Sequence, residues 1–94
     1  MVEKAEEKRI PIAKDSAEGR QTEEGFFIYD GEKGVLYKLD PLAYFVWSCC
    51  DGKHTTKDIV EEIEKHTNIP SSDLKPIVSK ILNVLKEANL IFWG

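Results

Sequence analysis

The stretch from residue 35 to residue 91 decides the fold, and it reads VLYKLDPLAYFVWSCCDGKHTTKDIVEEIEKHTNIPSSDLKPIVSKILNVLKEANLI. It opens with a β-prone run, Val35–Leu39, whose alternate side chains fall on opposite faces of a strand. Everything after this run is helical by pattern. Asp40 and Pro41 place an N-cap residue directly before a proline at the first helical position. The apolar run 41–49 therefore predicts a first helix that is buried on most sides.

A second helix is predicted from the pair Thr55 and Asp58, which resembles a capping box with Asp in the usual Glu position. This helix should begin after Thr55 and run to about Thr67. Its narrow apolar stripe consists of Ile59, Val60 and Ile63.

A third helix should begin near residues 71–73, because apolar residues then recur at helical spacing. They are Leu74, Ile77, Val78, Ile81, Leu82, Leu85 and Ala88. A proline is tolerated only in the first turn, so Pro76 predicts Ser72 or Asp73 as the N-cap. Asn89 is a plausible left-handed C-cap, and residues 90–93 should be extended.

The segment before residue 35 predicts strands. Two β-prone runs, 26–29 and 35–39, flank the turn sequence 30–34 and indicate a hairpin. Ile10–Ala13 should form a short strand that Pro11 confines to a sheet edge.

The polar residues 14–24 are expected to form a loop, and residues 1–9 a flexible N-terminal segment. Residues 10–94 are expected to form a single domain. The predicted fold class is α+β: a winged helix-turn-helix-like domain with a small three-stranded antiparallel sheet followed by three helices.

Charge and composition disfavour several functions. The formal net charge is −4, most of it in the N-terminal third, so no basic field attracts nucleic acid. No apolar run is long enough to span a membrane, and the charged start does not resemble a signal peptide, so a cytoplasmic location is expected. We expect no catalytic constellation, because phosphate-binding loops and nucleophile motifs are absent from the sequence.

No metal site or cofactor is expected either. The candidate ligands are Cys49, Cys50, His54 and His66, and adjacent cysteines do not supply the spacing of a zinc site. The two cysteines are expected to be free thiols, and Cys50 to be a core residue.

The stretch 35–91 also resembles the PqqD family. The resemblance rests on short motifs that keep the family's order and spacing: Leu39-Asp40, Ala43, Cys50-Asp51-Gly52, Thr55-Thr56-Lys57-Asp58-Ile59 and Asn89-Leu90-Ile91. It implies a non-catalytic module that binds the leader of a ribosomally made precursor peptide and presents it to a modifying enzyme, typically a radical S-adenosylmethionine enzyme. In this family the leader adds as a strand to the third strand of the sheet, in a groove shared with the third helix.

On this chain the resemblance implies a peptide site built from one strand and one helix. Its residues would be Val35, Leu36, Tyr37, Lys38, Leu39, Ile77, Lys80, Ile81 and Val84. Spacing at 100° per residue puts Val84 beside the core stripe, where it forms either a groove wall or a wider core.

Two other functions stay open at this point. A winged-helix DNA-binding regulator is favoured by Lys75, Lys80 and Lys86 on the last helix, and is disfavoured by the acidic total and by the lack of arginine after Arg20. A small enzyme has no acid, base or nucleophile constellation to support it.

Overall fold

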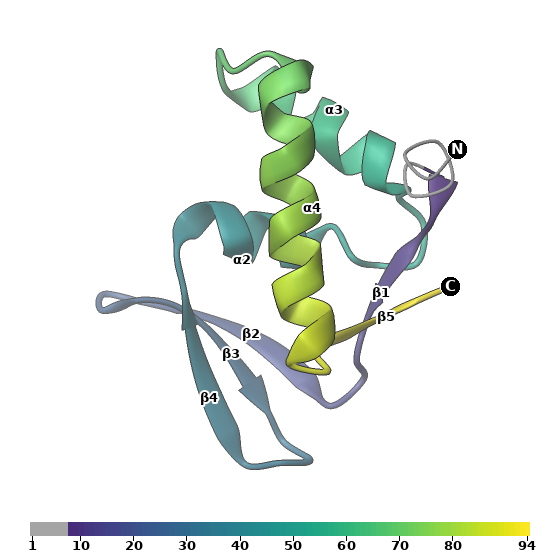
Figure 1. Cartoon of the computed structure of the whole chain (residues 1–94). Coiled ribbons are helices and arrows are strands. Elements are labelled where there is room, and N and C mark those ends of the chain that lie inside the picture. The colour runs from purple at the N-terminus through teal and green to yellow at the C-terminus, as the bar shows by residue number, and fades with distance from the viewer. Residues whose placement is uncertain (1–7) are drawn as a thin grey trace.

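A computed structural model describes residues 8–94 of the chain (Figure 1). A three-stranded antiparallel sheet is followed by three helices, as the sequence predicts. The strands of this sheet are β2 (Ala17–Thr22), β3 (Gly25–Asp30) and β4 (Val35–Leu39), in that order. The helices are α2 (Pro41–Ser48), α3 (Thr56–His66) and α4 (Ser71–Glu87). A separate two-stranded sheet pairs β1 (Pro11–Ala13) with β5 (Ile91–Trp93).

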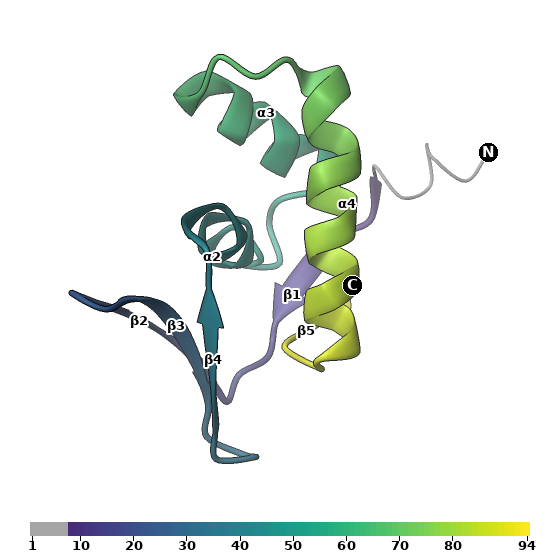
Figure 2. The same ribbon diagram turned by 60° about the vertical axis from the view of Figure 1, so that its left-hand side comes forward.

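The helices lie on one side of the sheet (Figures 1 and 2). Helix α2 lies directly over the sheet and contacts β3 and β4. Helix α4 stands beside α2, packs against α3 at one end and leads into β5 at the other. Strands β1 and β5 lie behind α4 in the view of Figure 2. This arrangement puts the edge formed by β4 on the same side of the molecule as α4.

The expectation that residues 14–24 form a loop is wrong, because β2 lies within them and pairs along its whole length with β3. The strand formed by residues 11–13 pairs instead with β5, in the second sheet. Sequence pattern misses β2 because its inner face holds small residues. A Cβ at Gly19 would lie 2.6 Å from Cζ3 of Trp47 and closer still to the Tyr44 hydroxyl. The approach of α2 therefore excludes the large apolar side chains that mark a strand.

The predicted hairpin β3–β4 is present, and its turn is fixed by a buried carboxylate. Asp30 is fully buried and accepts hydrogen bonds from Lys14 Nζ (3.2 Å), Ser16 Oγ (3.1 Å) and the backbone N–H of Glu32 (3.1 Å). Burial by itself raises the pKa of Asp30, but these hydrogen bonds outweigh it and the pKa lies below its ordinary value. Asp30 thus ties the segment before β2 to the β3–β4 turn.

The caps predicted for α2 and α3 are confirmed. The backbone N–H of Ala43 donates to Asp40 Oδ1 at 2.8 Å, which satisfies one free donor at the start of α2. At α3 the capping box is complete, because the Asp58 N–H donates to Thr55 Oγ1 (3.1 Å) and the Thr55 N–H donates to Asp58 Oδ2 (3.0 Å).

Helix α4 begins at Ser71, within the predicted range, but the predicted N-cap, Ser72 or Asp73, is wrong by two or three residues. Its N-cap is Pro70, with extended backbone and no side-chain cap, so Pro76 lies inside the helix beyond its first turn. The cost is limited there, because the ring removes a single hydrogen bond close to the helix start. The far end follows the prediction: Asn89 has φ 58°, and the Leu90 N–H reaches back to the Leu85 carbonyl at 2.9 Å.

The core is built mainly from α3 and α4, with single residues from the other elements. Its fully buried apolar members are Ile28, Val46, Cys50, Ile59, Val60, Ile63, Leu74, Val78, Leu82, Leu85, Leu90 and Ile91. Helix α2 is less buried than its composition predicts, since Val46 is its one fully buried residue. Its other apolar residues are partly buried: Leu42, Phe45 and Trp47 pack against the core, and the Tyr44 ring contacts Phe26 of β3.

At the N-terminal end, the expected flexible segment 1–9 lies outside the described residues except for Lys8 and Arg9. The carbonyl of Arg9 accepts a hydrogen bond from the Thr56 N–H at 3.0 Å. The Arg9 guanidinium lies 4.3 Å from the ring centre of Trp93. These contacts join the start of the described chain to α3 and β5.

The lowered pKa of Asp30 predicts how stability depends on pH. A carboxylate whose pKa falls on folding stabilises the protein above its ordinary pKa of 3.8, and this contribution is lost as the pH falls through the lowered value. Asp30→Asn should therefore unfold at lower urea concentration than the wild type at neutral pH, and the difference should shrink in acid. The exposed Asp15→Asn serves as control and should match the wild type. Equal stability of Asp30→Asn and wild type at every pH would contradict this account.

Candidate functional site

Among residues 8–94, no strand pairs with the outer edges of β2 and β4 in the three-stranded sheet, and these two edges differ in chemistry. Strand β2 reads AEGRQT, and its charged residues Glu18 and Arg20 pair with each other at 3.4 Å. Charged edge strands discourage the addition of a further strand. Strand β4 reads VLYKL and is mostly apolar. Its free side, turned away from β3, offers backbone N–H and C=O groups beside an apolar surface.

A groove of about 500 Å³ lies between the end of β4, the first turn of α2 and one face of α4. Its volume falls within the range of ordinary ligand sites. Three elements contribute the lining, which is mostly apolar: Lys38, Leu39, Asp40, Leu42, Ala43, Ile77, Lys80, Ile81, Val84 and Leu85. In Figure 2, β4 and α4 stand on the two sides of this region, and α2 lies above β4 and beside α4.

Helix α4 presents two different apolar faces. Its core face is fully buried and consists of Leu74, Val78, Leu82 and Leu85. On the groove face, Ile77 is 39% exposed and Val84 is 56% exposed. The alternative in which Val84 only widens the core is therefore excluded. Exposed apolar residues gathered around a groove are a feature of interaction sites.

The structure brings most of the predicted site residues together. Six of them line the groove: Lys38, Leu39, Ile77, Lys80, Ile81 and Val84. The remaining predicted residues lie further along β4, outside the groove lining. Val35 and Leu36 are exposed there, while Tyr37 packs against the core.

Four groove residues were not predicted: Asp40, Leu42, Ala43 and Leu85. The first three belong to the start of α2. A signal for them exists in the sequence, because the run 41–49 has more apolar residues than one helix face can bury. That excess was interpreted as burial in the core, whereas Leu42 and Ala43 face the groove.

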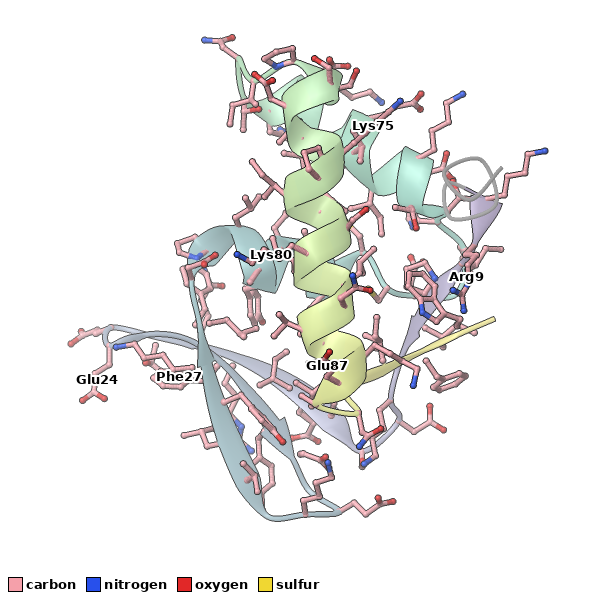
Figure 3. The ribbon with its side chains drawn as sticks, in the orientation of Figure 1. Arg9, Glu24, Phe27, Lys75, Lys80 and Glu87 are labelled. Carbon is pink, nitrogen blue, oxygen red and sulfur yellow. The ribbon has the colours of Figure 1, made fainter. Side chains whose placement is uncertain are left out.

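The charged side chains that line the groove differ in whether they have a hydrogen-bond partner. Asp40 uses its carboxylate to cap α2 through the N–H of Ala43. Lys38 and Lys80 are exposed, and within residues 8–94 their ammonium groups form no ion pair or hydrogen bond. Figure 3 shows the side chain of Lys80 extending from α4 toward α2. The groove is therefore apolar with a positively charged rim.

The cysteines and histidines do not gather into a site. Cys50 is 1% exposed, and its thiol donates to the Val46 carbonyl at 3.3 Å, as expected of a core residue. His54 Nδ1 lies 2.9 Å from Asp51 Oδ1, and this hydrogen bond raises the pKa of His54. Among the described residues, no group of three or more His, Cys, Asp or Glu side chains could hold a metal ion.

None of the helices formed by residues 8–94 is long and apolar enough to cross a bilayer.

Comparison with known proteins gives one family and a set of similar structures. The family model described as "Coenzyme PQQ synthesis protein D (PqqD)" matches residues 25–91. A solved structure titled "Lasso peptide synthetase B1 complexed with the leader peptide" superimposes with a TM-score of 0.75 at 17% identity, covering 88% of this chain and 98% of that one. A second, "TbiB1 in Complex with the TbiA(beta) Leader Peptide", gives 0.73 at 15% identity, covering 85% and 93%. No curated protein matches the sequence.

The two thiols should differ in reactivity. Burial, followed by the nearby Cys49 and Asp51, raises the pKa of Cys50 to about 12, and burial also raises the pKa of the half-buried Cys49. Iodoacetamide at mildly alkaline pH should therefore modify Cys49 slowly in the folded protein and Cys50 only after unfolding, as peptide mass spectrometry would show. Cys50→Ala should lower the free energy of unfolding by about 1 kcal/mol. Stoichiometric zinc that disappears in Cys50→Ala would refute the core assignment.

Proposed function

The chain belongs to the PqqD family, and we propose that it is a non-catalytic module that binds the leader of a ribosomally made precursor peptide. In this proposal the leader adds as a strand to the free edge of β4 and places alternate side chains in the groove against α4. The module then presents the peptide, in the cytoplasm, to a modifying enzyme. The family resemblance implies a radical S-adenosylmethionine enzyme as the usual partner.

One observation carries the proposal: the end of the unpaired edge of β4, at Lys38 and Leu39, borders an apolar groove whose other wall is α4. An unpaired strand offers main-chain donors and acceptors to any extended peptide, whatever its sequence. Side chains then select among peptides, because every second residue of an added strand faces the same side. Ile77, Ile81 and Val84 supply the apolar wall that such selection requires.

The rest of the fold suits this role. Helix α4 is anchored to the core by its buried face, so the groove wall is rigid. Strand β4 is held by β3 on one side only and by α2 at its end. The two solved structures with a similar fold are complexes with a leader peptide. This supports leader binding as the function of the present chain.

The alternative of a DNA-binding regulator rests on the lysines of α4. Lys75 and Lys80 are five residues apart in sequence, and so lie about 140° apart around the helix. Lys86 returns to the side of Lys75. The three lysines therefore form no single basic stripe that could follow a phosphate backbone. Lys80 moreover belongs to the groove.

Selection from a display library of short random peptides tests the proposal without knowledge of the natural leader. The full chain should enrich peptides with apolar residues at alternate positions, since these fit an added strand with one face in the groove. Enrichment that is unchanged in a variant with a blocked groove would show that the peptides bind elsewhere. Failure to enrich any shared pattern would contradict the proposal.

Val84→Glu should block the groove while sparing the fold. The side chain is 56% exposed, so a carboxylate there stays solvated in the free protein. In the complex it would be buried against apolar peptide side chains. Affinity for a selected peptide, measured by calorimetry, should fall by more than about tenfold, which needs only 1.4 kcal/mol. Ile69→Glu, an exposed apolar residue outside the groove, is the control. Equal affinity of Val84→Glu and wild type would remove Val84 from the site.

Duplex DNA should bind no better than non-specifically. With a net charge of −4 we expect a Kd of about 10⁻⁴ M or weaker at physiological salt. Fluorescence anisotropy with labelled duplexes of several sequences measures this. A sub-micromolar, sequence-dependent Kd would favour a regulator instead.

A further inference from the structure

The rim of the groove carries positive charge although the chain as a whole is acidic. Lys38 and Lys80 line the groove from β4 and α4 respectively. The acidic residue beside them, Asp40, caps α2 with its carboxylate, and it sets one negative charge against these two positive ones. Two lysine side chains whose ammonium groups have no partner within residues 8–94 therefore border the groove.

The two lysines lie on opposite faces of the position that an added strand would occupy. Side chains alternate along β4, and Lys38 lies opposite Phe27 on β3, on the face away from Leu39. A Cβ at Gly25 would meet Lys38 Cε at 3.4 Å, so in the unbound protein the lysine stem lies over β3, and it must swing toward the open edge to pair with an added strand. Lys80, by contrast, lies on the helix wall of the groove, between Ile77 and Val84 in sequence. Lys38 thus faces outward-pointing peptide residues and Lys80 faces inward-pointing ones.

We infer that the bound leader segment is acidic as well as apolar, with carboxylate side chains that pair with Lys38 and Lys80. The inference rests on the proposed function, because it concerns the same groove. Opposite charges on neighbouring strands stabilise strand pairing, and like charges destabilise it. Since the lysines face opposite sides of the added strand, their two carboxylate partners stand an odd number of positions apart in the leader.

The charge also explains how an acidic module captures an acidic ligand. The net charge of −4 arises mostly from the N-terminal third of the sequence, outside the groove lining. Paired charges close to a binding edge dominate over distant ones, because salt screens separations beyond roughly 10 Å. Lys38 and Lys80 therefore set the local charge preference, and basic peptides are rejected at the same edge.

The experiment is a parallel display selection against the wild-type chain and against the double variant Lys38→Glu/Lys80→Glu. Both side chains are exposed, so urea unfolding should show that the variant folds as the wild type does. The control variant Lys53→Glu/Lys57→Glu changes the net charge equally at exposed lysines outside the groove. Random peptides in one library serve all three proteins.

We expect the wild type and the control to enrich apolar peptides with Asp or Glu at fixed positions, and the Lys38→Glu/Lys80→Glu variant to enrich Lys or Arg there. A wild-type-selected acidic peptide should bind that variant about tenfold or more weakly, and salt should weaken its binding to the wild type. An identical, uncharged apolar pattern from all three proteins would overturn the charge inference and leave peptide binding intact. No shared pattern from the wild type would instead contradict the proposed function.

Discussion

Helix α4 has two apolar faces, and the division between them is the constraint on which this structure depends. Leu74, Val78, Leu82 and Leu85 are fully buried and hold α2, α3 and β5 together. Removing one such side chain costs about 2–5 kcal/mol in a typical core, a large share of the roughly 5–15 kcal/mol by which domains are stable. Ile77 and Val84 lie on the other face and remain exposed. The core thus fixes the helix that forms the groove wall.

Most of this arrangement could be predicted from sequence, because the helix ends and helix faces depend on residues close together in the chain. Asp40, Thr55 and Asn89 mark helix ends through hydrogen bonds or backbone geometry that each residue supplies itself. The helical spacing of apolar residues in α4 predicts both its core face and its groove face. Strand β2 could not be predicted, because the glycine at position 19 is required by contacts that are distant in sequence. The side chains of Tyr44 and Trp47 leave no space there for a larger residue. The N-cap of α4 is misplaced by the sequence because Pro76 is tolerated beyond the first turn, where its ring removes a single hydrogen bond.

The candidate site is likewise only partly predictable from the sequence. The residues on β4 and α4 follow from periodicity and from resemblance to the PqqD family. Leu42 and Ala43 could not be assigned, because only the position of α2 over the sheet decides which of its apolar residues face the core and which face the groove. The two lysines gain significance only once the fold places them at one rim. The fold leaves the edge of β4 unpaired, and the side chains of the groove then determine which peptides can bind there.

The central claim is that an extended peptide adds to the free edge of β4. Amide hydrogen exchange, followed residue by residue with and without a library-selected peptide, tests it most directly. In an antiparallel pair, alternate amides of β4 bond to β3 and the others point to the open edge. The account predicts that peptide slows exchange at these outward amides within Val35–Leu39 and leaves β2 unchanged. Slowed exchange at β2, or none at β4, would contradict it.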